Sequence, residues 1–243
     1  MKINRYSLIL TGLLLDFMST SVISAETMSP SATSSKAPDT IAARVQGCAT
    51  CHGPAGQGTA NANFPRIAAK PAGYLFNQLR NFQEGRRSYP PMSYLLEYLH
   101  DDYLHDMAAF FAAQPLSNTS LENSTLKPDA LARGERLVRY GASNQQIPPC
   151  ADCHGPQLTG INPGIPGLAG LHSRYISAQL EAWRVGTRRA KSPDCMHDIA
   201  SHLTDTQITE VSGWLASQSV PAHFAPAARG TWTPPLTCGS QPR

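Results

Sequence analysis

The feature that most constrains the fold is an internal repeat with a period of about one hundred residues. Matched positions are 101 or 102 residues apart early in each copy and 104 apart later: Cys48 with Cys150, Pro65 with Pro166, Tyr74 with Tyr175, Met92 with Met196, and Gln114 with Gln218. Chance similarity would not keep one spacing over many positions and then a second. The sequence therefore indicates a tandem duplication, and each copy is long enough to form a small domain.

Composition divides the 243 residues into these two copies and the segments around them. We expect one domain over residues 39–115 and a second over residues 128–219, joined by a polar linker over 116–127. Residues 26–38 are rich in Ser, Thr and Pro, which predicts a flexible leader. The Pro-rich C-terminal tail, residues 220–243, has no counterpart in the first copy.

Residues 1–25 have the order of a secretory signal. Lys2 and Arg5 precede the apolar run 6–18, and small residues follow as far as Ala25. We expect cleavage near Ala25 and a periplasmic protein. The apolar run is shorter than the roughly 20 residues of a membrane span, and no second run of that length follows, so at most peripheral membrane association is expected. The formal charge of +3 gives no support to nucleic-acid binding.

Helix signals fall at matching places in the two copies. Pro71 and Ser173 are expected to open helices that Gly85 and Gly186 close. Shorter helices are expected over 39–46 and 129–140. A capping box at Thr204–Gln207, and Asp101 as the capping residue in the first copy, predict the terminal helices. No run alternates as a strand would, so the fold class is all-α.

Two Cys-x-x-Cys-His sequences occupy matching positions in the two copies: Cys48, Cys51 and His52, then Cys150, Cys153 and His154. One helical turn separates the thiols, so both can add across the vinyl groups of one haem while the histidine reaches the iron. A zinc site would need a further Cys or His pair in each copy, and a thioredoxin-like site would need surrounding strands. The sequence predicts two covalently bound haem c groups.

The residue on the other side of each iron decides whether the iron passes electrons or binds small molecules. In the first copy we expect Met92, in a Pro-rich loop, because Met107 lies on an apolar helical face, where methionine usually fills space. In the second copy Met196 holds the repeat position of Met92. Cys195 and His197 flank it, and each is a ligand type that haem iron accepts, so they stay as alternatives.

The two cysteines left over are Cys195 and Cys238. In an oxidising compartment leftover thiols tend to pair, and we expect a disulfide between them.

Two arginine pairs, Arg86–Arg87 and Arg188–Arg189, lie between the middle helix and the methionine segment of their copies, within reach of haem propionates. Arg86 and Arg188 are the expected contacts. Pairing there would offset buried negative charge. The alternative is a solvated basic loop, whose ion pairs contribute little.

These motifs resemble the dihaem cytochrome c4 family. The resemblance rests on Pro65–Ala69, Tyr74–Leu79 and Gly85–Arg87 in the first copy, on Pro166–Gly170, Tyr175–Leu180 and Leu203–Asp205 in the second, and on Gly134–Gly141 with Ile147–Cys150 at the entry to the second attachment sequence. It implies tandem class I cytochrome c domains, each with about three to five short helices around one haem, and His/Met ligation of both irons.

The resemblance also implies a one-electron carrier between a quinol-oxidising complex or dehydrogenase and a terminal oxidase or reductase. We expect an electron-transfer protein and not an enzyme. Two other functions stay open. One is a haem enzyme that oxidises a sulfur compound or reduces peroxide at the second haem, and the other is the cytochrome subunit of a dehydrogenase.

Overall fold

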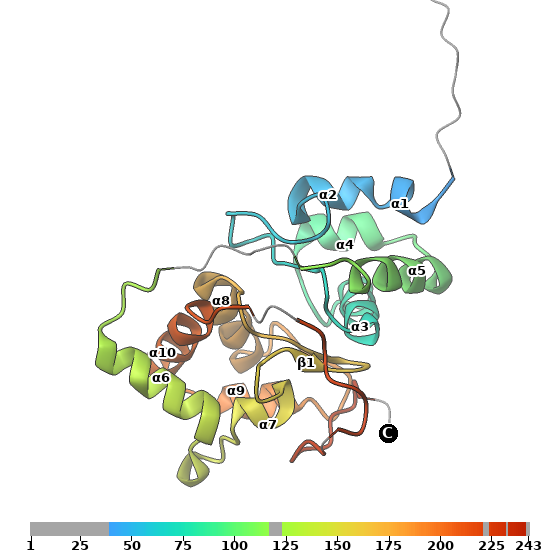
Figure 1. Ribbon diagram of the computed structural model, residues 1–243. Helices are drawn as coiled ribbons and strands as arrows, with labels where there is room; N and C mark the ends of the chain where they lie inside the picture. Colours follow the sequence, from blue (N-terminus) through green and yellow to red (C-terminus); the bar gives the residue numbers. More distant parts are fainter. Residues whose placement is uncertain (1–38, 117–122, 221–223, 232, 242–243) are drawn as a thin grey trace, which may run out of the picture. The chain divides into compact units, whose positions relative to one another are not determined.

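The computed structural model describes residues 39–116, 123–220, 224–231 and 233–241, and helices dominate these ranges (Figure 1). The predicted signal peptide, the leader 26–38 and the middle of the linker lie outside the described residues.

The first copy contains α1 (Ile41–Arg44), α2 (Gln46–His52), α3 (Ala72–Gln83), α4 (Pro90–Leu96) and α5 (Asp101–Ala112). The helix expected over 39–46 divides at Val45, and its second part continues through the first Cys-x-x-Cys-His sequence. Gly85 follows α3 with a positive φ of 68°, a backbone conformation that glycine adopts without strain, as expected of a residue that ends a helix.

The second copy contains α6 (Pro128–Tyr140), the short 3₁₀ helix η1 (Ser143–Gln145), α7 (Cys150–His154), α8 (Ser173–Arg184), α9 (Cys195–Ser201) and α10 (Asp205–Ala216). No run of the sequence alternates as a strand would, but the structure contains one short pair, in which β1 (Gly160–Ile161) lies antiparallel to β2 (Ile165–Pro166). Two residues per strand are too few to give an alternating pattern. The all-α class is otherwise confirmed.

Two predicted helix starts are shifted by one residue. His100 is the N-cap of α5 and Asp101 its first residue, while His172 is the N-cap of α8. The capping box of α10 is confirmed: the Thr204 hydroxyl accepts from the Gln207 N–H, and the Gln207 side chain accepts from the Thr204 N–H.

The ligand methionine of the first copy was expected in a loop, and this is wrong. Met92 is the third residue of α4, and Pro90 and Pro91 are its first two. Proline reads as a loop signal, but it is accepted at the first positions of a helix because the N–H groups there need no intrahelical partner.

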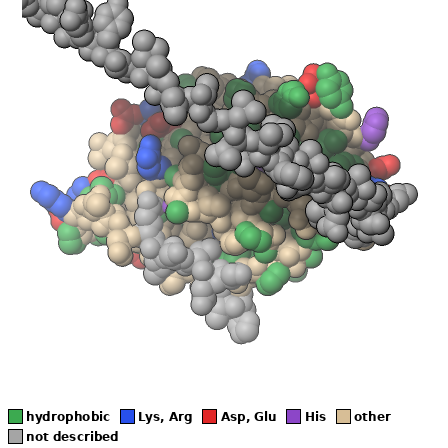
Figure 2. All heavy atoms as spheres, turned by 90° about the horizontal axis from the view of Figure 1, so that it is seen from above, with side chains coloured by type: hydrophobic (Ala, Val, Ile, Leu, Met, Phe, Trp, Pro, Cys, Tyr) green, Lys and Arg blue, Asp and Glu red, His purple; other side chains and the backbone are tan. Residues whose placement is uncertain are grey.

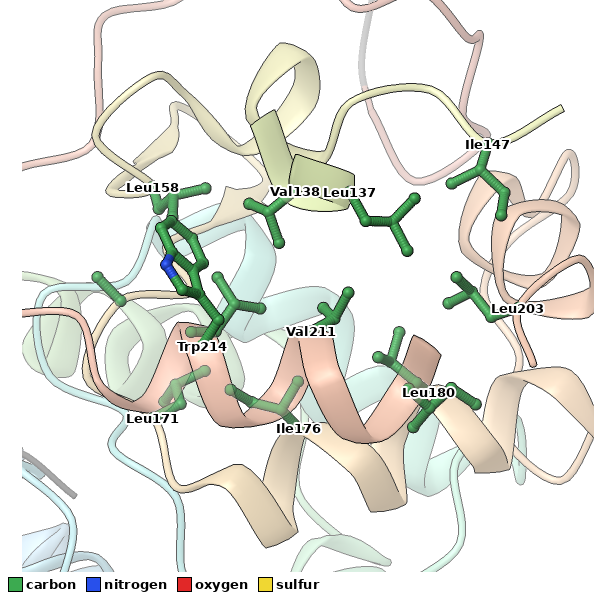
Figure 3. Packing of buried hydrophobic residues seen from close by; sticks show 13 residues of the cluster. Leu137, Val138, Ile147, Leu158, Leu171, Ile176, Leu180, Leu203, Val211 and Trp214 are labelled. Carbon is green, nitrogen blue, oxygen red and sulfur yellow. The ribbon is translucent and has the colours of Figure 1, made fainter. Parts of the chain in front are cut away.

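Each copy has its own hydrophobic cluster. In the first copy α3 and α5 supply Leu75, Phe82, Leu104 and Phe111. In the second copy α6, α8 and α10 surround a common interior, and Figure 3 shows side chains such as Leu137, Ile176, Leu180 and Val211 pointing into it. Each copy therefore folds around an interior of its own.

Charged side chains of both signs are scattered over the face seen in Figure 2 and do not gather in one patch. None of the helices in the described ranges is long and apolar enough to cross a membrane.

Candidate haem-binding sites

The two histidines of the Cys-x-x-Cys-His sequences are oriented in the same way. Each is the last residue of its helix and is buried. The Nδ1–H of His52 donates to the Pro65 carbonyl at 2.8 Å, and that of His154 donates to the Pro166 carbonyl at 2.7 Å. With Nδ1 occupied, Nε2 is the nitrogen left for a metal, and a carbonyl partner of this kind fixes ring orientation and tautomer.

Burial shifts the pKa values of the second attachment site. It lowers the pKa of His154 to about 4, so this imidazole is neutral, as a metal ligand must be. It raises the pKa of Cys150 to about 12 and that of Cys153 to about 11. Redox-active Cys-x-x-Cys pairs have depressed thiol pKa values, so these values disfavour the thioredoxin-like alternative.

In the second copy the predicted site residues line one pocket. Its walls are mainly apolar and include aliphatic side chains such as Leu180 and Leu215. Most of the residues at which chemistry was expected in the second copy are on its lining, namely Cys150, Cys153, His154, Arg188, Cys195 and Met196, whereas the alternative ligand His197 is not. An apolar pocket beside two cysteines and an oriented histidine fits a haem.

The three candidate ligands of the second site have different surroundings. Cys195 is bonded to Cys238, which confirms the expected disulfide, and a bonded sulfur cannot donate a thiolate. The Nδ1 of His197 donates to the Trp183 carbonyl at 2.8 Å. Met196 lines the pocket and packs against the hydrophobic cluster of the second copy.

The first copy also places an attachment cysteine and its candidate methionine beside its hydrophobic cluster. Cys48 and Met92 both pack, half-buried, against the cluster formed by α3 and α5. Met107 is only 7% exposed within the same cluster, which confirms its expected role as a core side chain.

Arginine, glutamine and tyrosine side chains link the two copies with approximate symmetry. Arg87 donates to Gln78 of its own copy and to Tyr175 and Gln179 of the other, at 3.0 Å in each case. Arg188 donates to Gln179 of its own copy at 2.6 Å and to Gln78 and Tyr74 of the other at 2.7 and 3.4 Å. These six residues are pairwise repeat positions, 101 apart.

The acceptors in this cluster are uncharged. Burial, followed by the charge of Arg87, lowers the pKa of the Arg188 guanidinium. Burial alone would raise the pKa of Tyr175, but Arg87 and Arg188 lower it below its ordinary value. Lys70, also buried, donates to the Gly167 carbonyl at 3.0 Å, and burial drives its pKa well below the ordinary value. Such a concentration of buried positive charge fits an anionic group that binds among these side chains.

Arg86 and Arg188 are placed differently. Arg188 is 3% exposed and lines the pocket, whereas Arg86 pairs with Glu84 and donates to the Asn81 side chain at 2.7 Å. The residue of the first copy that matches Arg188 in both register and contacts is Arg87.

Sequence reasoning missed Lys70 and Trp183 as site residues, and it preferred Arg86 to its neighbour Arg87. Trp183 lines the pocket, and the Cζ atom of the Arg188 guanidinium lies 3.6 Å from the centre of its ring. The buried indole Nε1 has no hydrogen-bond partner. A buried donor without an acceptor is costly, and a carboxylate of a bound group would satisfy it. The repeat could not point to Trp183, because the matching residue of the first copy is Phe82.

Comparison with known proteins supports the same assignment. The family model described as "Cytochrome c" matches residues 139–219. A thiosulfate dehydrogenase electron acceptor of Stutzerimonas stutzeri is 38% identical over 170 residues, which are 70% of this chain and 78% of that protein. A cytochrome c4 of Pseudomonas aeruginosa is 35% identical over 170 residues, 69% of this chain and 82% of that protein.

Solved structures agree. Reduced recombinant cytochrome c4 from Pseudomonas stutzeri is similar with a TM-score of 0.65 and 30% identity, over 73% of this chain and 96% of that one. Thiosulfate dehydrogenase from Marichromatium purpuratum gives a TM-score of 0.64 and 29% identity, over 70% of this chain and 36% of that one. With two oriented histidines, an apolar pocket beside attachment cysteines and these relatives, the chain belongs to the cytochrome c4 family: it has the class I cytochrome c fold, binds haem c covalently and carries electrons.

Proposed function

We propose that this protein is a periplasmic carrier of single electrons with two haem c groups, each ligated by one histidine and one methionine. Cys48, Cys51, Cys150 and Cys153 would hold the haems, His52 and Met92 would bind the first iron, and His154 and Met196 the second. Haem iron with two protein ligands accepts and donates one electron without making bonds to a substrate.

The observation that carries this proposal is the shared pocket of the second copy. His154 and Met196 line the same apolar space, whereas Cys195 is bonded to Cys238 and His197 is not among the residues that line the pocket. Two protein ligands on one iron leave no open coordination position, which favours a carrier over an enzyme.

The buried cations are proposed to hold the haem propionates. Arg188 and Trp183 would serve the second haem. The Arg188 guanidinium donates to uncharged acceptors, and the Trp183 indole N–H has no acceptor. For the first haem Arg86 was the original expectation, but its pairing with Glu84 supports Arg87 as the better candidate.

The protein's electron donor is proposed to be a dehydrogenase or a quinol-oxidising complex, and its acceptor a terminal oxidase or reductase. Two relatives, 38% and 36% identical, are thiosulfate dehydrogenase electron acceptors, which favours a dehydrogenase of sulfur compounds as the donor. Mixing the oxidised protein with thiosulfate and a thiosulfate dehydrogenase in a stopped-flow spectrometer tests this. Reduction of both haems at a rate that depends on dehydrogenase concentration is expected, and a rate no faster than without dehydrogenase would contradict this donor.

The ligand assignment has its own test. The oxidised protein should show a methionine-to-iron charge-transfer band for both haems, and the reduced protein should bind no carbon monoxide. The enzyme alternative instead requires turnover of thiosulfate or peroxide by the isolated protein, together with one five-coordinate or thiolate-ligated haem. Finding these would replace the carrier assignment.

A further inference from the structure

The C-terminal tail is the part of the chain that neither the repeat nor the carrier function explains. Its described residues, 224–231 and 233–241, lie along the second copy (Figure 1, red). Phe224 packs against the cluster of the second copy, and its ring faces the Arg66 guanidinium at 4.5 Å. Ala227 pairs with Ile161 of β1 and exchanges backbone hydrogen bonds of 2.9 Å with Gly160 and Asn162.

The end of the tail is fastened to the segment that carries Met196. Cys238 is bonded to Cys195, the residue immediately before Met196. The next residue, Gly239, donates its N–H to the Pro193 carbonyl at 2.8 Å. A Cβ on Gly239 would lie within 2.5 Å of the Lys191 and Ser192 backbone, so the two segments are in direct contact.

From this anchor the tail extends over the pocket. Cys238, Ser240 and Gln241 are all part of its lining. The Ser240 carbonyl accepts from the Asn77 side chain of α3 at 3.0 Å, so the tail also reaches the first copy. The wall of the pocket beside Met196 is thus built partly from residues that the repeat does not contain.

Among the described residues, the first copy has no matching disulfide anchor. Pro91 holds the repeat position of Cys195, so no disulfide can form there. On the same helix Tyr94 and Leu95 are 78% and 62% exposed. The tail therefore makes two otherwise similar sites unequal.

We propose that the C-terminal tail is a disulfide-anchored cap that closes the methionine side of the second haem site to small external ligands and holds Met196 in place. Cys238 acts through Cys195 and is a positioning residue. This inference rests on the proposed Met196 ligation, and it adds a function for a segment that the carrier assignment leaves unused.

The experiment uses carbon monoxide as the probe and the complete holoprotein reduced with ascorbate, which reduces haem iron but leaves a structural disulfide intact. Native protein, Cys238→Ser and Cys195→Ser are mixed with carbon monoxide, and binding is followed in the haem absorption bands. Native protein should show no binding, whereas both variants should bind carbon monoxide at the second haem and not at the first. The methyl resonance of haem-bound Met196, identified by its loss in Met196→Ala, shows which haem has reacted.

The native chain provides a control that needs no variant to fold. A water-soluble phosphine donates two electrons to the disulfide, giving two thiols and a phosphine oxide whose oxygen comes from water. Adding it to the reduced native protein should produce the carbon monoxide binding of Cys238→Ser, and adding it to Cys238→Ser should change nothing further.

Amide hydrogen exchange gives a readout that does not involve the haem. The Gly239 N–H should lose its protection when the disulfide is cut. If exchange shows the tail released while carbon monoxide still does not bind, the cap is disproved. If instead the second haem of the native protein binds carbon monoxide at once, the Met196 ligation is disproved, and the cap with it. The two proposals are therefore contradicted by different results.

Discussion

At the scale of single residues, one backbone carbonyl decides what each imidazole can bind. Pro65 and Pro166 accept from the Nδ1–H of His52 and His154, which leaves Nε2 of each ring for iron. Proline at these positions has no N–H of its own, so the carbonyl is the backbone group it contributes to the site.

Substituting either methionine should affect one haem only. In Met196→Ala the second iron loses its thioether, so carbon monoxide should bind the reduced second haem while the first keeps its charge-transfer band. Met92→Ala should give the reverse pattern. Absorption spectra of both variants check this, and an unchanged second haem in Met196→Ala would point to His197, since Cys195 is bonded.

Removing the buried charge of Arg188 should lower the reduction potential of the second haem, because a nearby cation favours the reduced state. For Arg188→Gln we expect a decrease on the order of tens of millivolts in a redox titration. Arg188→Lys keeps the charge, so the potential should decrease less than in Arg188→Gln. The neighbouring Arg189 is exposed, so Arg189→Gln is the control and should leave both reduction potentials at their native values within error. Equal shifts in Arg188→Gln and Arg189→Gln would argue against a specific contact of Arg188.

At the scale of helices, α6 and α10 approach too closely for a side chain between them. A Cβ on Gly134 would lie 2.2 Å from the Glu210 carbonyl oxygen. The same contact is reinforced by Arg133, which pairs with Glu210 at 2.6 Å. The crossing of these two helices forms one side of the second interior.

Gly134→Ala should therefore force α6 and α10 apart. We expect a loss of about 1–3 kcal/mol in the free energy of unfolding, the usual cost of overpacking. Gly47 is the matched control, since a Cβ there meets nothing within 4 Å, and Gly47→Ala should change stability by less than about 0.5 kcal/mol. Urea unfolding followed by circular dichroism measures both, and equal effects would contradict the close approach.

At the scale of the whole molecule, hydrogen bonds join the two copies. The symmetric arrangement of Arg87 and Arg188 with Gln78 and Gln179 ties them together around buried positive charge. We propose that residues 39–115 and 128–219 are separate domains, which their two hydrophobic clusters support.

A double-mutant cycle on Arg87→Ala and Tyr175→Phe should reveal this coupling. Arg87 donates to the Tyr175 hydroxyl at 3.0 Å, and a hydrogen bond from a charged donor predicts an interaction of about 1.5–3 kcal/mol. The exposed pair Arg44 and Asp39 serves as the control, with a coupling near zero. Additive effects of Arg87→Ala and Tyr175→Phe in urea unfolding would disprove the link between the copies.

The sequence by itself determined the duplication, the attachment cysteines, the histidines and the methionine positions. These depend on local spacing: one helical turn separates the two thiols, and the repeat carries Met92 onto Met196. The cysteine count with the expected compartment also predicted that Cys195 bonds Cys238, which the structure confirms.

Only the tertiary structure decided which arginine faces the other copy, that Trp183 has an unpaired donor, and that the tail lines the second pocket. Arg86 and Arg87 are neighbours of the same type, so spacing could not separate them. The contacts that distinguish Arg87 come from residues about ninety positions away. Short-range sequence patterns report the local backbone, whereas burial and unpaired donors arise when distant segments meet. That is why the attachment sequences and the disulfide could be predicted from the sequence, while the contacts of the tail and of the arginines could not.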